Sequence, residues 1–141
     1  AYLWLMEMSY SLVEISQVAK ALLKEYGHKS IWAFRAPMGA GKTTLIAALC
    51  KQMGIEDNVT SPTFAIMNQY EVGGKLIFHM DWYRLENEKE ALHAGVEAAF
   101  EEAHFCFIEW PEKAKGLLPE DAQIFQIEIL DAEHRRIFIP S

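Results

Sequence analysis

A glycine-rich turn between a strand-like run and a helical run restricts this chain to few folds. Residues 30–34 are apolar and rich in β-forming side chains, and residues 42–52 carry helical apolar spacing that stops near Gly54. Between them, residues 39–44 read Gly-Ala-Gly-Lys-Thr-Thr. Glycines in such a turn let backbone N–H groups approach an anion, and the positive N-terminus of the next helix favours one. The order of strand, turn and helix therefore predicts a phosphate-binding loop.

This turn matches the P-loop pattern Gly-x4-Gly-Lys-Ser/Thr from the second glycine of the pattern onward. In that pattern the lysine, here Lys42, reaches the β- and γ-phosphates, and the next hydroxyl, on Thr43, binds Mg²⁺. The first glycine of the pattern is replaced by Ala36, whose Cβ allows fewer backbone angles. We expect this replacement to weaken nucleotide affinity without changing the chemistry.

The rest of the chain alternates between strand-like and helix-like runs. We therefore expect an α/β fold of the P-loop NTPase type, with three layers and a mixed, mostly parallel central sheet. The other predicted elements are a first amphipathic helix over 11–26 ended by Gly27, a hairpin of 64–70 and 75–80, a helix over 86–103 bent near Gly95 with Leu92 on its apolar side, a central strand over 104–108 buried on both faces, and a final hairpin of 124–130 and 136–139.

The size and composition predict one globular unit. The chain has 141 residues, of which 51% are hydrophobic and 23% charged, and this suffices for one core. We expect a single P-loop ATPase domain over 1–141, with residues 1–8 as an added or flexible start because the chain does not begin with Met. Cys50 and Cys106 lie in apolar runs without metal-ligand spacing, so we expect buried thiols and a reducing, cytoplasmic setting.

The charge pattern argues against direct binding to nucleic acid or membrane. The net charge is −7, and no segment gathers the Lys and Arg needed to neutralise several backbone phosphates. No apolar run approaches the roughly 20 residues that span a bilayer. The five histidines show no ligand spacing, so we expect them to be solvated or satisfied within the core.

Two acidic residues end predicted strands. Asp81 follows the run 76–80, and Glu109 follows the run 105–108. In open α/β sheets the carboxyl ends of strands supply the acidic groups near bound phosphates. Either carboxylate could bind Mg²⁺ directly, bind it through water, or orient the attacking water.

Four sequence blocks in a fixed order resemble the bacterial TsaE (YjeE) family. They are Gly-Ala-Gly-Lys-Thr-Thr-Leu at 39–45, Val-Thr-Ser-Pro-Thr-Phe at 59–64, His-Met-Asp-Trp-Tyr-Arg-Leu at 79–85, and Ile-Glu-Trp-Pro-Glu-Lys at 108–113. The first helix and the final hairpin fit as well. Pro37 and Met38 depart from the family's usual Asp and Leu at the start of the loop.

The resemblance implies an ATPase that uses ATP and Mg²⁺ and assists threonylcarbamoyladenosine formation beside the anticodon of tRNA. It implies TsaD and TsaB as protein partners, with tRNA reached only through their assembly. By resemblance Asp81 and Glu109 are the catalytic acids, and Thr43 and Glu109 hold the metal. The nucleotide-binding residues would be Gly39, Ala40, Gly41, Lys42, Thr43, Thr44 and Trp110, and a switch-like loop would consist of Ser61, Pro62 and Thr63.

Two other functions compete with this reading. A small-molecule P-loop kinase would need an acceptor pocket and a lid carrying several arginines, but the arginines here are few. A regulatory module could instead bind nucleotide without useful turnover. Arg84 either stabilises transition-state charge or pairs with Glu86 or Glu88. The guanine-reading segment Asn-Lys-x-Asp is missing from the sequence, which favours ATP over GTP.

Overall fold

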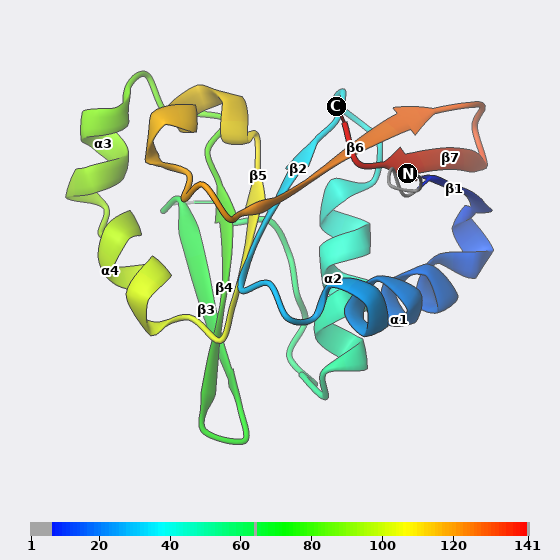
Figure 1. Ribbon diagram of the computed structural model, residues 1–141, viewed down its shortest axis with the longest axis horizontal. Helices are drawn as coiled ribbons and strands as arrows, with labels where there is room; N and C mark the ends of the chain where they lie inside the picture. The colour runs from blue at the N-terminus through cyan, green and yellow to red at the C-terminus, as the bar shows by residue number, and fades with distance from the viewer. Residues whose placement is uncertain (1–6, 64, 141) are drawn as a thin grey trace.

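A seven-stranded sheet forms the centre of the computed structural model, which describes residues 7–63 and 65–140. Its strand order is β1-β7-β6-β2-β5-β4-β3 (Figure 1). The strands are β1 Glu7–Ser11, β2 Ile31–Arg35, β3 Met67–Val72, β4 Lys75–Asp81, β5 Phe105–Glu109, β6 Gln123–Ile129 and β7 His134–Phe138.

The sheet is mixed, as predicted, but not mostly parallel in its pairing, because three strand pairs are parallel and three are antiparallel among the described residues. β2 pairs in parallel with both β5 and β6, and β5 pairs in parallel with β4. The hairpin partners β3 and β7 run antiparallel to β4 and β6, and β1 runs antiparallel to β7. Therefore β1, β6, β2, β5 and β4 point in one direction, and their carboxyl ends meet at one edge of the sheet.

Helices cover both faces of the sheet and complete the three layers (Figure 1). One face carries α1 Ile15–Tyr26 and α2 Lys42–Gln52, and the other carries α3 Glu88–His93, α4 Val96–Glu102 and the 3-10 segment η2 Pro111–Leu117. A 3-10 turn, η1 Leu12–Glu14, leads into α1, and a capping box between Ser11 and Glu14 fixes its start. Gly95, at φ 86°, separates α3 from α4 where the sequence predicted a bend.

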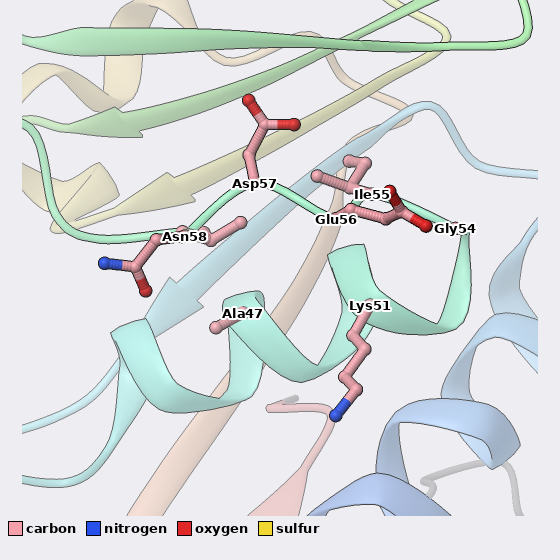
Figure 2. Close-up of a pocket in the computed structure, with 8 residues that line it drawn as sticks. Ala47, Lys51, Gly54, Ile55, Glu56, Asp57 and Asn58 are labelled. Carbon is pink, nitrogen blue, oxygen red and sulfur yellow. The ribbon is translucent and has the colours of Figure 1, made fainter.

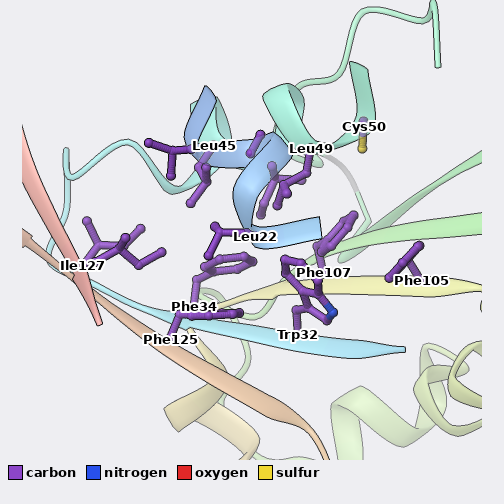
Figure 3. Packing of buried hydrophobic residues seen from close by; sticks show 14 of the residues in the cluster. Leu22, Trp32, Phe34, Leu45, Leu49, Cys50, Phe105, Phe107, Phe125 and Ile127 are labelled. Atoms are coloured by element: carbon purple, nitrogen blue, oxygen red, sulfur yellow. The ribbon is translucent and has the colours of Figure 1, made fainter. Parts of the chain in front are cut away.

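Each face of the sheet has its own hydrophobic core. On the α1/α2 side, Leu22, Leu45 and Leu49 pack over aromatic side chains of the central strands (Figure 3). Trp32 of β2 meets Phe107 of β5 edge-on, with ring centroids 5.4 Å apart. All five residues of β5 are buried, which confirms the prediction of a central strand covered on both faces. Cys50 and Cys106 are buried free thiols, also as predicted.

The structure corrects two details. The expected flexible start does not extend to Glu7 and Met8, which lie in β1 and pair with β7, while residues 1–6 lie outside the described residues. Leu92 was expected on the apolar side of its helix but is 42% exposed, and Ala91 is buried in its place. The interruption at Gly95 explains the second difference, because α3 and α4 are separate helices and do not share one apolar stripe.

Leu22 and Leu92 provide a matched test of the core. We expect Leu22→Ala, at a residue 1% exposed, to lower the free energy of unfolding by about 2–5 kcal/mol, because it removes buried methyl groups and leaves a cavity. Leu92→Ala should cost no more than about 0.5 kcal/mol. Urea unfolding followed by tryptophan fluorescence measures both, and equal losses would contradict the assigned layers.

Candidate functional site

The glycine-rich loop leaves β2 and runs directly into α2. Gly39 and Gly41 have φ values of 79° and 91°, in the left-handed region that favours glycine. Trp110 is the one non-glycine residue with positive φ in the described ranges, so Ala36 adopts an ordinary backbone angle. An alanine therefore fits at the first position of the loop without backbone strain.

Lys42 folds back over the loop from the first turn of α2. Its Nζ donates hydrogen bonds to the carbonyl oxygens of Ala36, at 2.9 Å, and Pro37, at 3.4 Å. The residue is only 5% exposed, and burial lowers the pKa of the Lys42 ammonium, while Glu109, Glu112 and Asp81 act in the opposite direction. The cation is thus poorly solvated, and this favours a bound anion.

Parallel pairing places the two predicted acids side by side. Asp81 ends β4 and Glu109 ends β5, and the two residues are partners in register. Thr43 Oγ1 donates to Glu109 Oε2 at 2.9 Å. Ser61 Oγ donates to Asp81 Oδ2 at 2.9 Å, and the backbone N–H of Tyr83 donates to Asp81 Oδ1 at 2.9 Å. The first turn of α2, the switch-like loop and both strand ends therefore converge.

These oxygen ligands fit Mg²⁺. A threonine hydroxyl and a carboxylate in direct contact are hard oxygen donors, which Mg²⁺ prefers. Among the described residues, no group of three or more His, Cys, Asp or Glu side chains could hold a metal by itself. Mg²⁺ is usually bound by one or two protein ligands together with phosphate oxygens and water.

His79 belongs to the site, although the sequence analysis expected a solvated or satisfied core histidine. It is fully buried on β4, two residues before Asp81 and on the same face, and its Nε2 lies 2.6 Å from Glu109 Oε2. With that carboxylate ionised, Nε2 is the donor. Its Nδ1 has no partner within the described part of the chain, so only one ring nitrogen is satisfied. The period-2 spacing from Asp81 was the signal available in the sequence.

An aromatic pair covers Lys42. Trp110 lies in the left-handed region at φ 59°, and its ring centroid is 4.0 Å from Lys42 Nζ. The Tyr83 ring packs on Trp110, with ring centroids 5.0 Å apart.

Arg84 Nη1 donates to the carbonyl oxygen of Thr63 at 2.6 Å, and so neither Glu86 nor Glu88 is needed to explain the position of Arg84.

Most of the predicted site residues line a single cavity of about 470 Å³, within the usual range of ligand pockets. Pro62 lines an adjoining cavity of about 190 Å³ next to Asp81 and Arg84, and Thr63 contacts Arg84 through its backbone. The residues lining the first cavity are Met38, Gly39, Ala40, Gly41, Lys42, Thr43, Thr44, Ser61, Asp81, Tyr83, Arg84, Glu109 and Trp110.

A larger cavity, of about 630 Å³, lies elsewhere. It is formed by α2 and the loop that follows, with Lys51, Ile55 and Asp57 among its lining residues (Figure 2). None of the predicted site residues lines it, so cavity volume alone does not mark the site.

In the described ranges, the helices are too short or too polar to cross a membrane.

A double-mutant cycle tests the buried contact between His79 and Glu109. We expect His79→Leu to lower the free energy of unfolding by about 1–3 kcal/mol, because the Glu109 carboxylate loses a buried donor. In a Glu109→Gln background the same change should cost less, giving a coupling of at least about 0.5 kcal/mol in urea unfolding. Additive losses would mean that the 2.6 Å contact contributes nothing.

Known proteins match most of this chain. A family model described as "Threonylcarbamoyl adenosine biosynthesis protein TsaE" matches residues 9–137. A Haemophilus influenzae protein named tRNA threonylcarbamoyladenosine biosynthesis protein TsaE is 38% identical over 114 residues, covering 80% of this chain and 72% of that protein. The Aquifex aeolicus protein of the same name is 33% identical over 138 residues, covering 94% of this chain and 89% of that protein.

The fold also matches a solved structure. The crystal structure of Bacillus subtilis YdiB has a TM-score of 0.73 and 23% sequence identity, covering 96% of this chain and 84% of that one. At that identity the match supports the fold alone. The family model, however, spans the β3–β4 hairpin, the glycine-rich loop, both strand-end acids and all but the last residue of β7, and on that match this chain belongs to the TsaE family.

Proposed function

We propose that this chain is a Mg²⁺-dependent P-loop ATPase that supports threonylcarbamoyladenosine modification of tRNA. The observation that carries the proposal is the convergence of Lys42, the Thr43–Glu109 contact and Asp81 on one cavity at the carboxyl edge of the sheet. The relatives named as biosynthesis proteins for this modification support the biological role. A cytoplasmic location fits this role.

The loop binds the nucleotide phosphates in this proposal. Lys42 exchanges the carbonyl oxygens of Ala36 and Pro37 for the β- and γ-phosphate oxygens, which are stronger acceptors because they are charged. Backbone N–H groups of residues 41–44, at the N-terminus of α2, add further donors. Trp110, already packed over Lys42, borders the same space and excludes water from it.

The two acids have different functions in this proposal. Thr43 and Glu109 hold Mg²⁺, which neutralises charge on the β- and γ-phosphates when bound. Glu109 is held by His79 and Thr43 through the same oxygen, Oε2, and this fixes the orientation of the carboxylate. Asp81, fixed by Ser61 and the Tyr83 N–H, faces the same cavity and orients the attacking water.

The switch-like loop links the site to partners. Ser61 is bonded to Asp81, and the Thr63 carbonyl accepts from Arg84, so both ends of the loop are tied to residues that line the cavity. A change at the γ-phosphate therefore alters the contacts that hold this loop. The family resemblance implies TsaD and TsaB as partner proteins. Because the chain is acidic and lacks a basic footprint, we infer that it reaches tRNA only through them.

Lys42→Ala tests the nucleotide site. We expect it to abolish ATP binding and phosphate release, because it removes the cation directed at the β- and γ-phosphates. Lys51→Ala is the matched control, since Lys51 is on the same helix but lines a different cavity. Calorimetric titration with ATP and Mg²⁺ and phosphate release without any acceptor are the measurements.

A folded Lys42→Ala variant with unchanged phosphate release would contradict the assignment. Phosphate transfer only in the presence of a small hydroxylated acceptor would instead support the kinase alternative. Binding of ATP without turnover, even with partners present, would support the regulatory module.

Partner coupling should be reciprocal. If ATP tightens the binding of TsaD and TsaB, those proteins must tighten ATP binding by the same factor. We expect labelled ATP to bind more tightly in their presence than labelled ADP does, because only ATP supplies the γ-phosphate that the Ser61–Thr63 loop would sense. Equal affinities for both nucleotides, with and without partners, would remove the switching role and leave the P-loop assignment intact.

A further inference from the structure

A buried arginine of the final hairpin donates hydrogen bonds to the glycine-rich loop. Arg135 lies on β7 and is 7% exposed. Its Nε donates to the carbonyl oxygen of Ala40 at 3.0 Å, across 95 residues of sequence, and its Nη2 reaches the carbonyl oxygen of Gly39 at 3.5 Å. The guanidinium therefore holds two consecutive peptide groups of the predicted phosphate loop.

The other side of the guanidinium is anchored in the hairpin itself. Arg135 Nη1 donates to the carbonyl oxygens of Asp131, at 2.7 Å, and His134, at 3.0 Å. The Asp131 carboxylate accepts from the backbone N–H groups of Glu133 and His134, which makes the turn rigid. The same guanidinium is thus hydrogen-bonded both to the hairpin and to the loop.

This cation has no carboxylate partner in the part of the chain that the structure describes. Across β1 its register partner is Tyr10, whose hydroxyl is buried and without a hydrogen bond among the described residues. Burial raises the pKa of Tyr10 to about 12, against the opposing effect of Arg135. A buried cation held only by backbone carbonyls is costly to fold, so its position calls for a reason beyond ion pairing.

The geometry of the peptide group supplies that reason. In a trans peptide the N–H points opposite to the C=O, and the described residues contain no cis bond. Because the Ala40 carbonyl points to Arg135, the N–H of the same peptide, which belongs to Gly41, points away from Arg135. The loop residues Gly39, Ala40 and Gly41 line the cavity that also contains Lys42.

We propose that Arg135 is a positioning residue for nucleotide binding: it anchors the Gly39 and Ala40 carbonyls so that the Gly41 N–H stays directed at the phosphates. The Ala40 N–H, by contrast, donates to the carbonyl oxygen of Pro37 within the loop. The inference rests on the proposed nucleotide function of this loop. Anchoring removes loop conformations that would otherwise have to be ordered on binding. It also places a positive charge behind an anion site in a chain of net charge −7.

The experiment compares Arg135→Met, Arg135→Lys and Arg136→Met with the unaltered chain. Arg136 is the matched control, because it is the next residue on β7 but pairs at the surface with Glu128 and Glu7 and has no bond to the loop. Affinity for ADP and ATP with Mg²⁺ is measured by calorimetry well below each melting temperature. Hydrogen exchange of the peptide covering residues 36–44 is measured without nucleotide.

We expect Arg135→Met to weaken affinity for both nucleotides by on the order of tenfold or more, the usual scale for losing a hydrogen bond to a charged group. Exchange in residues 36–44 should accelerate. Arg135→Lys keeps the charge but lacks the planar fork that reaches two carbonyls, so it should show the same losses to a smaller degree. Arg136→Met should match the unaltered chain in affinity and in loop exchange.

Wild-type affinity in a folded Arg135→Met variant would overturn the proposal. Wild-type affinity in Arg135→Lys would also overturn it, since a point charge would then suffice. If Arg135→Met does not fold, the Arg135→Lys result decides. Failure of the unaltered chain to bind either nucleotide would instead refute the proposed function. The two failures are therefore distinguishable.

Discussion

Three neighbouring strands, β2, β5 and β4, pair in parallel and end at the same edge of the sheet. The glycine-rich loop leaves β2 at this edge, Glu109 ends β5 and Asp81 ends β4. The register brings Asp81 and Glu109 side by side although 28 positions of sequence separate them. Every contact of the candidate site, from Thr43 on Glu109 to Ser61 on Asp81, depends on this shared edge. The aromatic core beneath it, built on Trp32 and Phe107, holds the strands in that register.

The site contains several buried polar and charged side chains. Lys42, Glu109, His79 and Arg135 are all buried, and two of them, Lys42 and Arg135, satisfy their donors largely on backbone carbonyls. Burying a cation on backbone carbonyls costs desolvation energy, so the placement of Lys42 and Arg135 is better explained by ligand binding than by stability. The polyanion of the proposed function would compensate the two cations, and Mg²⁺ would compensate the acids.

The alanine at the first position of the loop is explained by the backbone. Only Gly39 and Gly41 in this loop have positive φ, and Ala36 instead packs against the core on the α1/α2 side. Its carbonyl oxygen is also the resting acceptor for Lys42. The geometry therefore gives no reason for the weaker nucleotide affinity that the sequence suggested at this position.

The sequence by itself determined most of the order of the elements, the glycine-rich loop between β2 and α2, and the two acids at strand ends. Local sequence patterns predict these features: apolar periodicity, glycines in a turn between a strand and a helix, and carboxylates directly after apolar runs. The strand β1 escaped prediction because Tyr10 is its one fully buried residue, and its backbone pairs only with a strand from the other end of the chain. The contacts of His79 and Arg135 could not be predicted for the same reason. A histidine in a strand and an arginine in a hairpin have no local signature of function, and only the tertiary structure decided that one meets Glu109 and the other meets the glycine-rich loop, because both contacts form across strands distant in sequence.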